Sequence, residues 1–273
     1  MRIAFLGQPG SHSEGAAVQY SGSALEPVCC ESFAAIFAAV ATGRADYAVV
    51  PIENSLAGSL HSNYDLLLQH ELHIVGEVNY QVHQHLLALP GVALADLRRV
   101  GSHPQALDQC AAYLTRLGVQ REPLADTTLA ARRLVDENLR DTGAVAGPRA
   151  AELYGLAVLA EDIADLPENY TRFLVLARDF TPPAPGQPGK TSLVFSLENR
   201  PGSLYRALTV FAERGINLTK IESRPLRGRR WEYFFYLDFA VSLRDPRAAA
   251  ALQELERMAP FLRILGSYPQ DRA

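Results

Sequence analysis

A short stretch rich in proline and glycine divides this chain of 273 residues into two unequal parts. Residues 180–189 read FTPPAPGQPG, and four prolines with two glycines in ten residues cannot continue a helix or a central strand. We therefore expect an extended, semi-rigid linker at residues 181–190. It leaves about 180 residues before it and about 80 after it, so the sequence predicts one large unit and one small unit.

The pattern of apolar residues predicts a different fold for each part. The first part alternates short apolar runs, such as residues 45–52, with helical periodicity, as in residues 32–44. This alternation is typical of an α/β domain with a mainly parallel sheet. The last part reads strand, helix, strand, strand, helix, strand over residues 192–267, and this βαββαβ order predicts a ferredoxin-like fold.

Charge and cysteine content exclude several classes of protein. The chain carries 26 basic and 30 acidic residues, a formal net charge of −4, which leaves no electrostatic footprint for nucleic acid. No apolar run approaches the roughly 18 residues of a membrane span, and the first apolar run breaks at Gly7, too early for a signal peptide. Three cysteines make neither a disulfide framework nor a zinc pattern, so we expect a reduced, cytoplasmic protein without metal.

Lysine is scarce and confined to the small part of the chain. Only Lys190 and Lys220 are lysines, and the remaining 24 of the 26 basic residues are arginines. The first 189 residues therefore cannot form a Schiff base through a lysine amine, and they lack the lysine of a P-loop. We attach no function to the arginine bias.

The segment GQPGSHS at residues 7–13 follows one strand and opens a helix. A dinucleotide-binding loop would need a second glycine at position 9, where Pro9 stands, so the sequence disfavours a nicotinamide cofactor. A helix N-terminus that binds an anion, with the hydroxyl groups of Ser11 and Ser13 beside it, fits better.

Two further polar segments lie where strands end. The segment PIENSLAGS at residues 51–59 could contact a ligand at the sheet edge, or Asn54 or Ser55 could cap a turn. In SHPQ at residues 102–105, His103 could act as a general base, but the serine and glutamine of this segment also match a capping box. Both interpretations stay open for each segment.

The segment NYTRF at residues 169–173 precedes an apolar strand. Thr171 has no activating lysine or adjacent histidine, so we do not expect a covalent threonine mechanism. Arg172 at the start of a buried strand needs a carboxylate, and the candidates are Asp165, Glu168 or an anionic substrate.

Together these segments resemble the prephenate dehydratase family over nearly the whole chain. The matching stretches of the first part are GQPGSHSE (7–14), PIENSLAGSLHSNYDLLL (51–68), SHPQALDQC (102–110), DTTLAAR (126–132), YGL (154–156) and NYTRF (169–173). In the last part, ENRPGSLYRAL (198–208) and INLTKIESRP (216–225) resemble the ACT domain attached to these enzymes. Several motifs in the same order make this resemblance specific.

The resemblance implies decarboxylative dehydration of prephenate to phenylpyruvate in L-phenylalanine synthesis, without metal or cofactor. It implies an α/β fold with a bilobed, periplasmic-binding-protein-like catalytic domain at residues 1–180. Lobe 1 is expected at about 1–76 and 163–180, and lobe 2 at about 77–162. A ferredoxin-like βαββαβ ACT domain is expected at 191–268. The resemblance also implies feedback by L-phenylalanine, and a homodimer or homotetramer formed through both domains.

The same resemblance implies roles for individual residues. The family's essential threonine falls on Thr171, with Arg172 and Phe173 beside it. Substrate contacts are implied for Ser11, Asn54, Ser55, Ser102 and Gln105. Effector contacts are implied for Gly202, Ser203, Leu204, Asn217, Glu222, Ser223 and Arg224. Two positions depart from the common pattern: Ser11 stands where threonine is common, and Ser203 stands where alanine is usual.

Three alternatives remain. An arogenate dehydratase performs the same chemistry on a substrate with an amino group in place of the keto oxygen, and residues 73–92 resemble the plant enzymes that discriminate the two substrates. A non-catalytic sensor would join a lobe pair to an amino-acid-binding ACT domain, but the retained TRF segment at 171–173 speaks against it. A nicotinamide enzyme with an ACT domain conflicts with Pro9. In the favoured reading, a Thr171 hydroxyl hydrogen-bonds the departing hydroxyl group.

Overall fold

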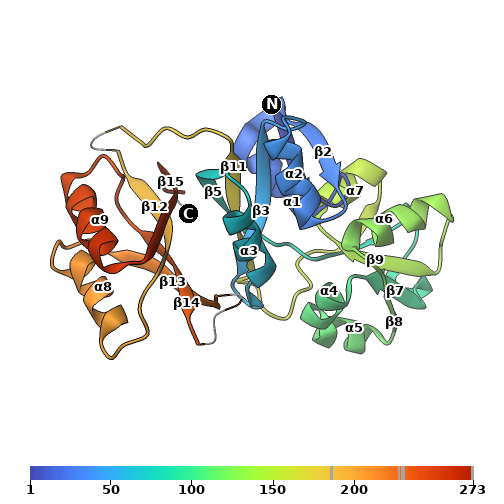
Figure 1. Ribbon diagram of the computed structural model, residues 1–273. Coiled ribbons are helices and arrows are strands. Elements are labelled where there is room, and N and C mark those ends of the chain that lie inside the picture. Colours follow the sequence, from blue (N-terminus) through green and yellow to red (C-terminus); the bar gives the residue numbers. More distant parts are fainter. Residues whose placement is uncertain (185–186, 227, 229–230, 272–273) are drawn as a thin grey trace.

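The computed structural model describes residues 1–184, 187–226, 228 and 231–271. It has three parts, which we call the first lobe, the second lobe and the C-terminal domain, and the first lobe lies between the other two (Figure 1). The α/β fold class is confirmed, with two lobes before a ferredoxin-like domain. Pro185 and Gly186 of the expected linker lie outside the described residues.

The first lobe is a six-stranded sheet covered by helices on both faces. Its strands are β1 (Arg2–Leu6), β2 (Glu26–Cys30), β3 (Tyr47–Asn54), β4 (Gly58–Ser59), β5 (His73–Gln81) and β11 (Tyr170–Ala177). Its helices are α1 (His12–Ser21), η1 (Gly22–Ala24), α2 (Phe33–Ala41) and α3 (His61–Gln69). The order is β2-β1-β3-β11-β5, with β4 paired to β3. Strands β1, β2 and β3 are parallel, but β11 is antiparallel to both of its neighbours, so the sheet is mixed rather than mainly parallel.

The second lobe is built on a five-stranded sheet with the order β10-β6-β9-β7-β8. Its strands are β6 (His85–Ala88), β7 (Arg99–Ser102), β8 (Gln120–Pro123), β9 (Thr142–Ala146) and β10 (Ala157–Ala160). Its helices are η2 (Leu94–Asp96), α4 (Pro104–Gln109), α5 (Ala111–Leu117), α6 (Thr127–Asp136) and α7 (Pro148–Tyr154). Strands β7, β8 and β9 are parallel, while β6 and β10 are antiparallel, so this sheet is mixed too.

The lobe boundaries differ from the expected ones. The chain leaves the first lobe after Gln81 and returns to it at Tyr170, whereas the sequence placed these crossings near residues 76 and 163. The expected boundary near residue 76 falls inside β5. The whole of β5 belongs to the first lobe, because it pairs with β11 along its length and Gln81 lies opposite Tyr170. An apolar pattern predicts a strand but does not say which sheet the strand joins, so the error has a physical cause.

The C-terminal domain has the predicted βαββαβ order. Its elements are β12 (Gly189–Ser196), α8 (Ser203–Ala212), β13 (Leu218–Pro225), β14 (Tyr233–Phe239), α9 (Pro246–Met258) and β15 (Phe261–Pro269). The four strands are antiparallel in the order β13-β14-β12-β15. Helices α8 and α9 cover one face, where Phe195, Phe211 and Phe239 are fully buried.

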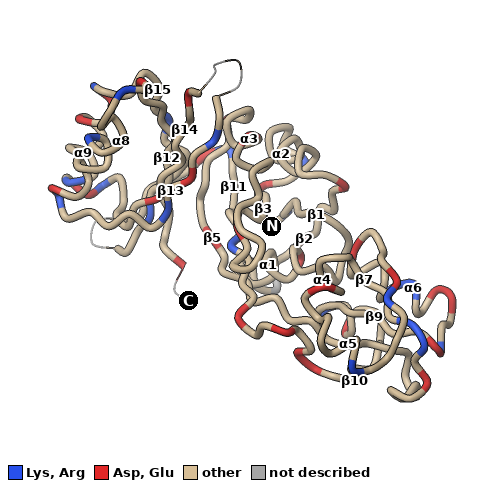
Figure 2. The backbone as a smooth tube through the Cα atoms, turned by 90° about the horizontal axis from the view of Figure 1, so that it is seen from below, with Lys and Arg blue, Asp and Glu red and all other residues tan. Residues whose placement is uncertain are grey.

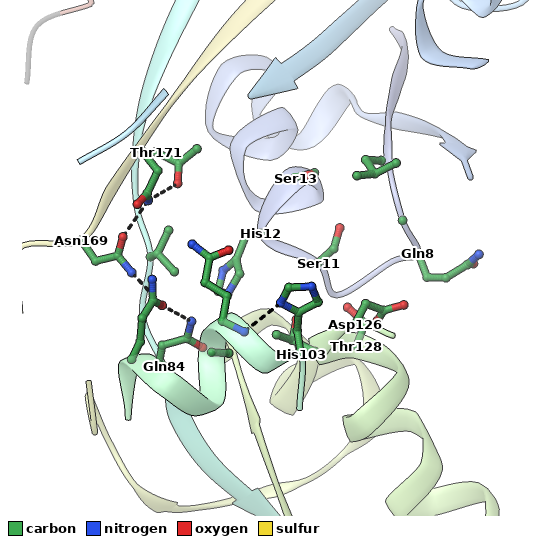
Figure 3. A pocket seen from close by; sticks show the side chains of 18 residues that line it. Gln8, Ser11, His12, Ser13, Gln84, His103, Asp126, Thr128, Asn169 and Thr171 are labelled. Atoms are coloured by element: carbon green, nitrogen blue, oxygen red, sulfur yellow. Dashed lines mark hydrogen bonds between the residues drawn. The ribbon is translucent and has the colours of Figure 1, made fainter. Parts of the chain in front are cut away.

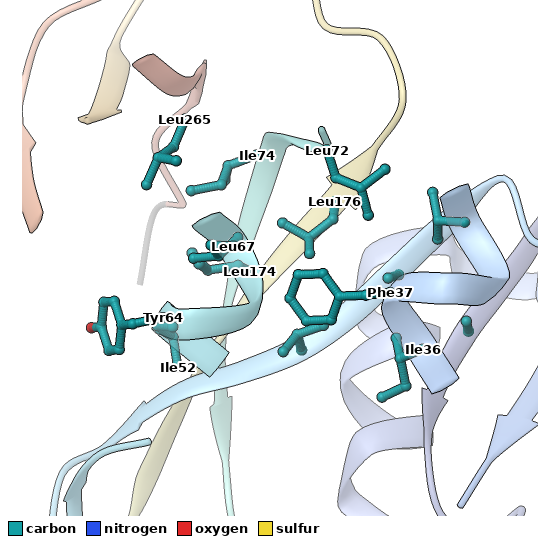
Figure 4. Packing of buried hydrophobic residues seen from close by; sticks show 14 of the residues in the cluster. Ile36, Phe37, Ile52, Tyr64, Leu67, Leu72, Ile74, Leu174, Leu176 and Leu265 are labelled. Carbon is teal, nitrogen blue, oxygen red and sulfur yellow. The ribbon is translucent and has the colours of Figure 1, made fainter. Parts of the chain in front are cut away.

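The other face of this sheet packs directly on the first lobe. Tyr64 of α3 contacts Tyr236 of β14 edge to face, with ring centroids 4.8 Å apart, and one hydrophobic core continues across both units (Figure 4). Strand β15 approaches β5 so closely that a Cβ atom on Gly266 would lie 2.0 Å from the carbonyl oxygen of Ile74. The two units are therefore joined by a packed interface and not only by the linker.

Both lysines of the chain lie at this interface. Lys190 Nζ is 2.6 Å from an oxygen of Glu77 on β5, and Lys220 Nζ is 2.9 Å from an oxygen of Glu53 on β3. Each pair joins the C-terminal domain to the first lobe. Elsewhere, basic and acidic positions are mixed along the described chain (Figure 2).

Candidate active site

A cavity of about 290 Å³ lies between the two lobes and is lined by residues from both. Eighteen residues line it (Figure 3). The first lobe contributes the start of α1 and the ends of β3 and β11. The second lobe contributes α4, the start of α6 and the segment that enters it, with Val82 and Gln84.

Thr171 lies on the cavity wall and is oriented by Asn54. The Nδ2 of Asn54 donates to Thr171 Oγ1 at 3.0 Å, and also to Asn169 Oδ1 at 2.8 Å. The orientation of the Asn54 amide is fixed by its other end, because Oδ1 accepts the backbone N–H groups of Leu56 and Ala57 at 3.0 and 2.9 Å. Since Thr171 Oγ1 accepts from Asn54, its own hydrogen is available to a ligand.

A chain of amide side chains continues from this point along the pocket wall (Figure 3). Asn169 Nδ2 donates to Gln109 Oε1 at 3.2 Å, and Gln84 Nε2 donates to the same oxygen at 3.3 Å. Each amide thus fixes the orientation of the next, beginning at the backbone N–H groups that hold Asn54. At the far end, Gln84 lies beside His12, and a hydrogen bond between the two side chains acts on the pKa of His12.

His12, in the first turn of α1, also lines the cavity. Its ring lies 6.1 Å from the ring of Tyr80, and a Cβ atom on Gly147 would come within 2.9 Å of it, so the ring is held closely. Burial is the largest cause that lowers the pKa of His12 to about 4; the charge of His83 adds to this, and Gln84 acts in the opposite direction. The imidazole is therefore neutral at pH 7.

The electrostatics of the cavity come from dipoles rather than from cationic side chains. None of the eighteen described lining residues is lysine or arginine, and the one carboxylate, Asp126, caps α6 by accepting the Leu129 N–H at 2.6 Å. Helices α1 and α6 both begin at the cavity, so their N-terminal N–H groups favour an anion there. The Nδ1 of His103 accepts the Gln105 N–H at 3.2 Å, which leaves Nε2 as a donor in the neutral ring.

Four of the residues implied for catalysis or substrate contact gather at this cavity: Ser11, Asn54, Gln105 and Thr171. Ser55 and Ser102 do not line it. Ser55 Oγ instead joins the loop after β3 to β11, by donating to the Glu168 carbonyl and accepting the Tyr170 N–H. Ser102 is fully buried and donates to the Val145 carbonyl at 2.6 Å, so it holds β7 to β9.

Arg172 and Phe173, which were expected at the catalytic site, do not line the cavity either. Side chains alternate across a strand, so Thr171 faces the cavity while Arg172 faces the C-terminal domain. There Arg172 binds Glu77 at 2.8 Å and Asp238 at 2.7 Å, and neither Asp165 nor Glu168 is its partner. Phe173 is buried in the core beneath α1, in edge contact with Tyr80.

The sequence reasoning missed several lining residues, among them His12, Gln84, Gln109, Thr128 and Asn169. Asn169 and His12 stood inside quoted motifs, so their position beside Thr171 and Ser11 was a usable signal. Gln109 and Thr128 also stood inside the quoted stretches 102–110 and 126–132, whereas Gln84 stood in none of the motifs quoted for the site. Gln84, in the segment that enters the second lobe, meets Gln109 on α4, so the folding of the second lobe decides this contact.

The residues implied for the effector lie on two elements of the C-terminal domain. Gly202, Ser203 and Leu204 form the start of α8, where Gly202 has φ = 79°, a conformation that favours glycine. On β13, the side chain of Glu222 faces the first lobe, where it accepts from Ser59 at 2.6 Å. Arg224 faces the same way.

Arg224 binds Asp65 of α3 at 3.2 Å. Ser223 lies between these two residues on the opposite, exposed face of β13. Asn217 precedes β13, and its carbonyl accepts the Ala240 N–H. Glu222 and Arg224 therefore serve the interface between the units in this single chain, and they do not join the start of α8 in one pocket.

Comparison with known proteins agrees with this architecture. The family model for prephenate dehydratase matches residues 3–181, and the model for the ACT domain matches residues 191–257. The chain belongs to the prephenate dehydratase family. The resemblance inferred from the motifs is thereby confirmed.

Relatives with similar sequences include plant proteins of this family. The chain is 52% identical over 280 residues to "Arogenate dehydratase/prephenate dehydratase 2, chloroplastic" of Arabidopsis thaliana, covering 99% of this chain and 73% of the relative. It is 51% identical over 285 residues to "Arogenate dehydratase 2" of Petunia hybrida, covering 99% and 72%.

Two solved structures are similar over nearly the whole chain. A prephenate dehydratase from Arthrobacter aurescens in complex with L-Phe has a TM-score of 0.89 and 36% identity, covering 98% of this chain and 90% of that one. A protein described as GqqA, a novel type of quorum quenching acylase, has a TM-score of 0.92 and 38% identity, covering 99% and 98%. Proteins with this fold thus carry names of different activities.

The structure also bears on two predictions, the absence of a membrane span and the cellular location. None of the helices in the described part of the chain combines the length and apolar character needed to cross a membrane. The three cysteines are free thiols. The cytoplasmic location stays a prediction, and several plant relatives carry the word chloroplastic in their names.

Proposed function

We propose that this chain catalyses the decarboxylative dehydration of prephenate to phenylpyruvate, a step of L-phenylalanine synthesis, and that L-phenylalanine regulates it through the ACT domain. In this reaction the bond between the ring and its carboxylate breaks, and carbon dioxide leaves. The electron pair moves through the ring, which becomes aromatic, and the ring hydroxyl departs and takes up a proton to become water.

The observation that carries this proposal is the hydrogen bond from Asn54 to Thr171. Because Thr171 Oγ1 is the acceptor in that bond, its O–H is free to donate to a ligand in the cavity that Thr171 lines. A threonine hydroxyl is a poor acid, so we assign it the role of hydrogen-bonding the negative charge that develops on the departing oxygen. Its position is preorganised, since Asn54 is itself held by two backbone N–H groups.

The substrate's carboxylates need partners as well. In a cavity whose described lining holds no lysine or arginine, the N-termini of α1 and α6 supply N–H groups without intrahelical acceptors. Ser11 belongs to this region, although its Oγ already accepts the Glu14 N–H at 3.2 Å as the cap of α1. His103, whose Nδ1 accepts the Gln105 N–H, can donate to the substrate through Nε2.

The test replaces Thr171 and follows phenylpyruvate formation from prephenate. We expect Thr171→Ala to lower kcat by at least about tenfold with the fold intact, because one preorganised donor is lost. Thr171→Ser, which keeps the hydroxyl, is the matched control and should retain more activity than Thr171→Ala. Turnover by Thr171→Ala at the wild-type rate would exclude the proposed role.

The regulatory part of the proposal rests on the interface between the ACT domain and the first lobe. Strand β13, which carries residues implied for the effector, binds the first lobe through Lys220, Glu222 and Arg224. Glu53, the partner of Lys220, is adjacent to Asn54, so a shift of β13 reaches the residue that orients Thr171. A coupling of about 1–3 kcal/mol corresponds to roughly 5–150-fold in affinity.

We place the effector between two copies of the chain, because β13 is an edge strand of its sheet and Ile221 on it is exposed. Activity measured with millimolar L-phenylalanine should fall, and the sedimentation coefficient should show a dimer or tetramer. Unchanged activity at that concentration would refute the regulation and leave the catalytic proposal intact.

A further inference from the structure

A second cavity, of about 180 Å³, adjoins the active-site cavity at the start of α6. Six residues line it, and three of them, Gln8, Asp126 and Thr128, also line the active-site cavity. Its lining includes Arg132, whereas the described lining of the active-site cavity includes no lysine or arginine. A ligand in the active site can therefore extend into a neighbouring cavity that offers a cation.

Thr128 stands where the two cavities meet, and its hydroxyl group lacks a partner. The residue is 2% exposed, and its Oγ1 makes no hydrogen bond within the part of the chain that the structure describes. Its methyl group packs toward Gly10 of the first lobe, where a Cβ atom would lie 3.4 Å from it. Native proteins seldom leave a buried hydroxyl unpaired, so Thr128 indicates a ligand that supplies the missing bond.

The backbone around Thr128 favours a ligand with a negative charge. Helix α6 has ten residues, and its cap, Asp126, accepts the N–H of Leu129 at 2.6 Å. The N–H groups of Thr127 and Thr128 precede Leu129 in the first turn and have no intrahelical acceptor. These N–H groups and the positive end of the helix dipole are attractive to an anion.

Arg132 supplies the full positive charge that the active-site cavity lacks. It follows Thr128 by one helical turn, so both side chains lie on the same face of α6. Its pair with Asp136, at 3.4 Å, is exposed and therefore weak, which allows the guanidinium group to turn toward a ligand. Asp126, which lines both cavities, would repel an anion, and the charge of Arg132 offsets it.

The two carboxylates of prephenate make opposite demands on such a cation. One is lost as carbon dioxide, and because its negative charge disappears in the transition state, a cation bound to it would stabilise the ground state and slow the reaction. The other, on the side chain, keeps its charge throughout. The carbon that carries both groups lies across the ring from the hydroxyl. Figure 3 shows Thr171 on one side of the cavity and Asp126 and Thr128 on the other.

We propose that the second cavity binds the side-chain carboxylate that the substrate keeps. The Thr128 hydroxyl and the Arg132 guanidinium group donate to its oxygens, while the carboxylate that is lost stays in the active-site cavity. The inference rests on the proposed function, because the hydroxyl of the ring must lie at Thr171 for the side chain to point this way. Arogenate carries the same carboxylate, so this contact serves both substrates.

The test measures the KM for prephenate and the inhibition constant of phenylpyruvate. This product keeps the side-chain carboxylate and lacks the ring carboxylate and the hydroxyl. Arg132→Gln should raise both constants at least about tenfold, with a smaller change in kcat, and Arg132→Lys should raise them less. Thr128→Val keeps the methyl group and should raise both at least about threefold. Arg133→Gln removes the adjacent arginine, which binds Glu122 on β8, and as the matched control should leave both within about threefold.

The side chain of Arg132 is 49% exposed, so its replacement should leave the fold intact, which circular dichroism checks. A cation on the carboxylate that is lost would give another result: Arg132→Gln would raise kcat and leave inhibition by phenylpyruvate unchanged. That outcome would overturn the inference. So would a rise in only one constant, no rise in either variant or in one of them, or a wild type that millimolar phenylpyruvate does not inhibit. A wild type that turns over neither prephenate nor arogenate refutes the proposed function, and this inference with it.

Discussion

Four charged side chains are buried together where the C-terminal domain meets the first lobe. Arg172 and Lys190 are positive, Glu77 and Asp238 are negative, and none of the four side chains is more than 13% exposed. Glu77 binds both cations, and Asp238 binds Arg172. The cluster is therefore balanced, with two charges from each unit.

The change Asp238→Asn removes one negative charge and almost no volume. One positive charge is then left without compensation, because Glu77 has to serve both Arg172 and Lys190. Breaking a buried pair by removing one partner costs about 3–5 kcal/mol. Arg172 keeps its bond to Glu77 at 2.8 Å, so we expect the lower end, about 3 kcal/mol.

The assay is urea denaturation at pH 7 followed by circular dichroism, with the free energy of unfolding taken from the transition that includes the C-terminal domain. The double variant Asp238→Asn, Lys190→Met restores the charge balance, so it should be at least about 1 kcal/mol more stable than Asp238→Asn alone. Glu198→Gln, in an exposed pair with Arg200, is the control and should change stability by less than about 1 kcal/mol. Losses that simply add in the double variant, or a single loss below about 1 kcal/mol, would refute the reasoning.

Three further predictions follow from single residues. The pKa of His12 is lowered to about 4, so below pH 6.5 the unfolded chain binds a proton that the folded chain does not. Stability should thus fall between pH 6.5 and 4 by about 3 kcal/mol more in the wild type than in His12→Phe; parallel pH profiles would contradict this. Gly266→Ala places a Cβ atom against the Ile74 carbonyl and should cost about 2 kcal/mol or more, measured as a lower urea midpoint. Ser102→Ala should cost about 1 kcal/mol through its lost bond to Val145 and leave kcat/KM within threefold, whereas a large rise in KM would restore its expected role in substrate binding.

Much of the fold was predictable because it depends on local patterns. The βαββαβ order of the C-terminal domain follows from alternating apolar periods, and the Pro-rich stretch separates it from the lobes. The strand of residues 73–81 was assigned to two lobes, however, because apolar spacing does not record pairing with Tyr170 and the strand it begins. Only hydrogen bonds between distant segments decide that.

The candidate site, like the fold, was predictable only in part. The motif order alone placed Thr171, Asn54, Ser11 and Gln105 in one family and one site, and all four line the cavity.

By itself, the sequence determined the family, the number of units and the hydroxyl proposed to act on the substrate. The tertiary structure alone decided that Arg172 serves the domain interface. It also brought both lysines to that interface, and it placed Gln84 beside His12 at the cavity. The reason is physical: a residue's identity fixes its chemistry, but its partner is fixed by which face of which strand meets another segment far away in the chain.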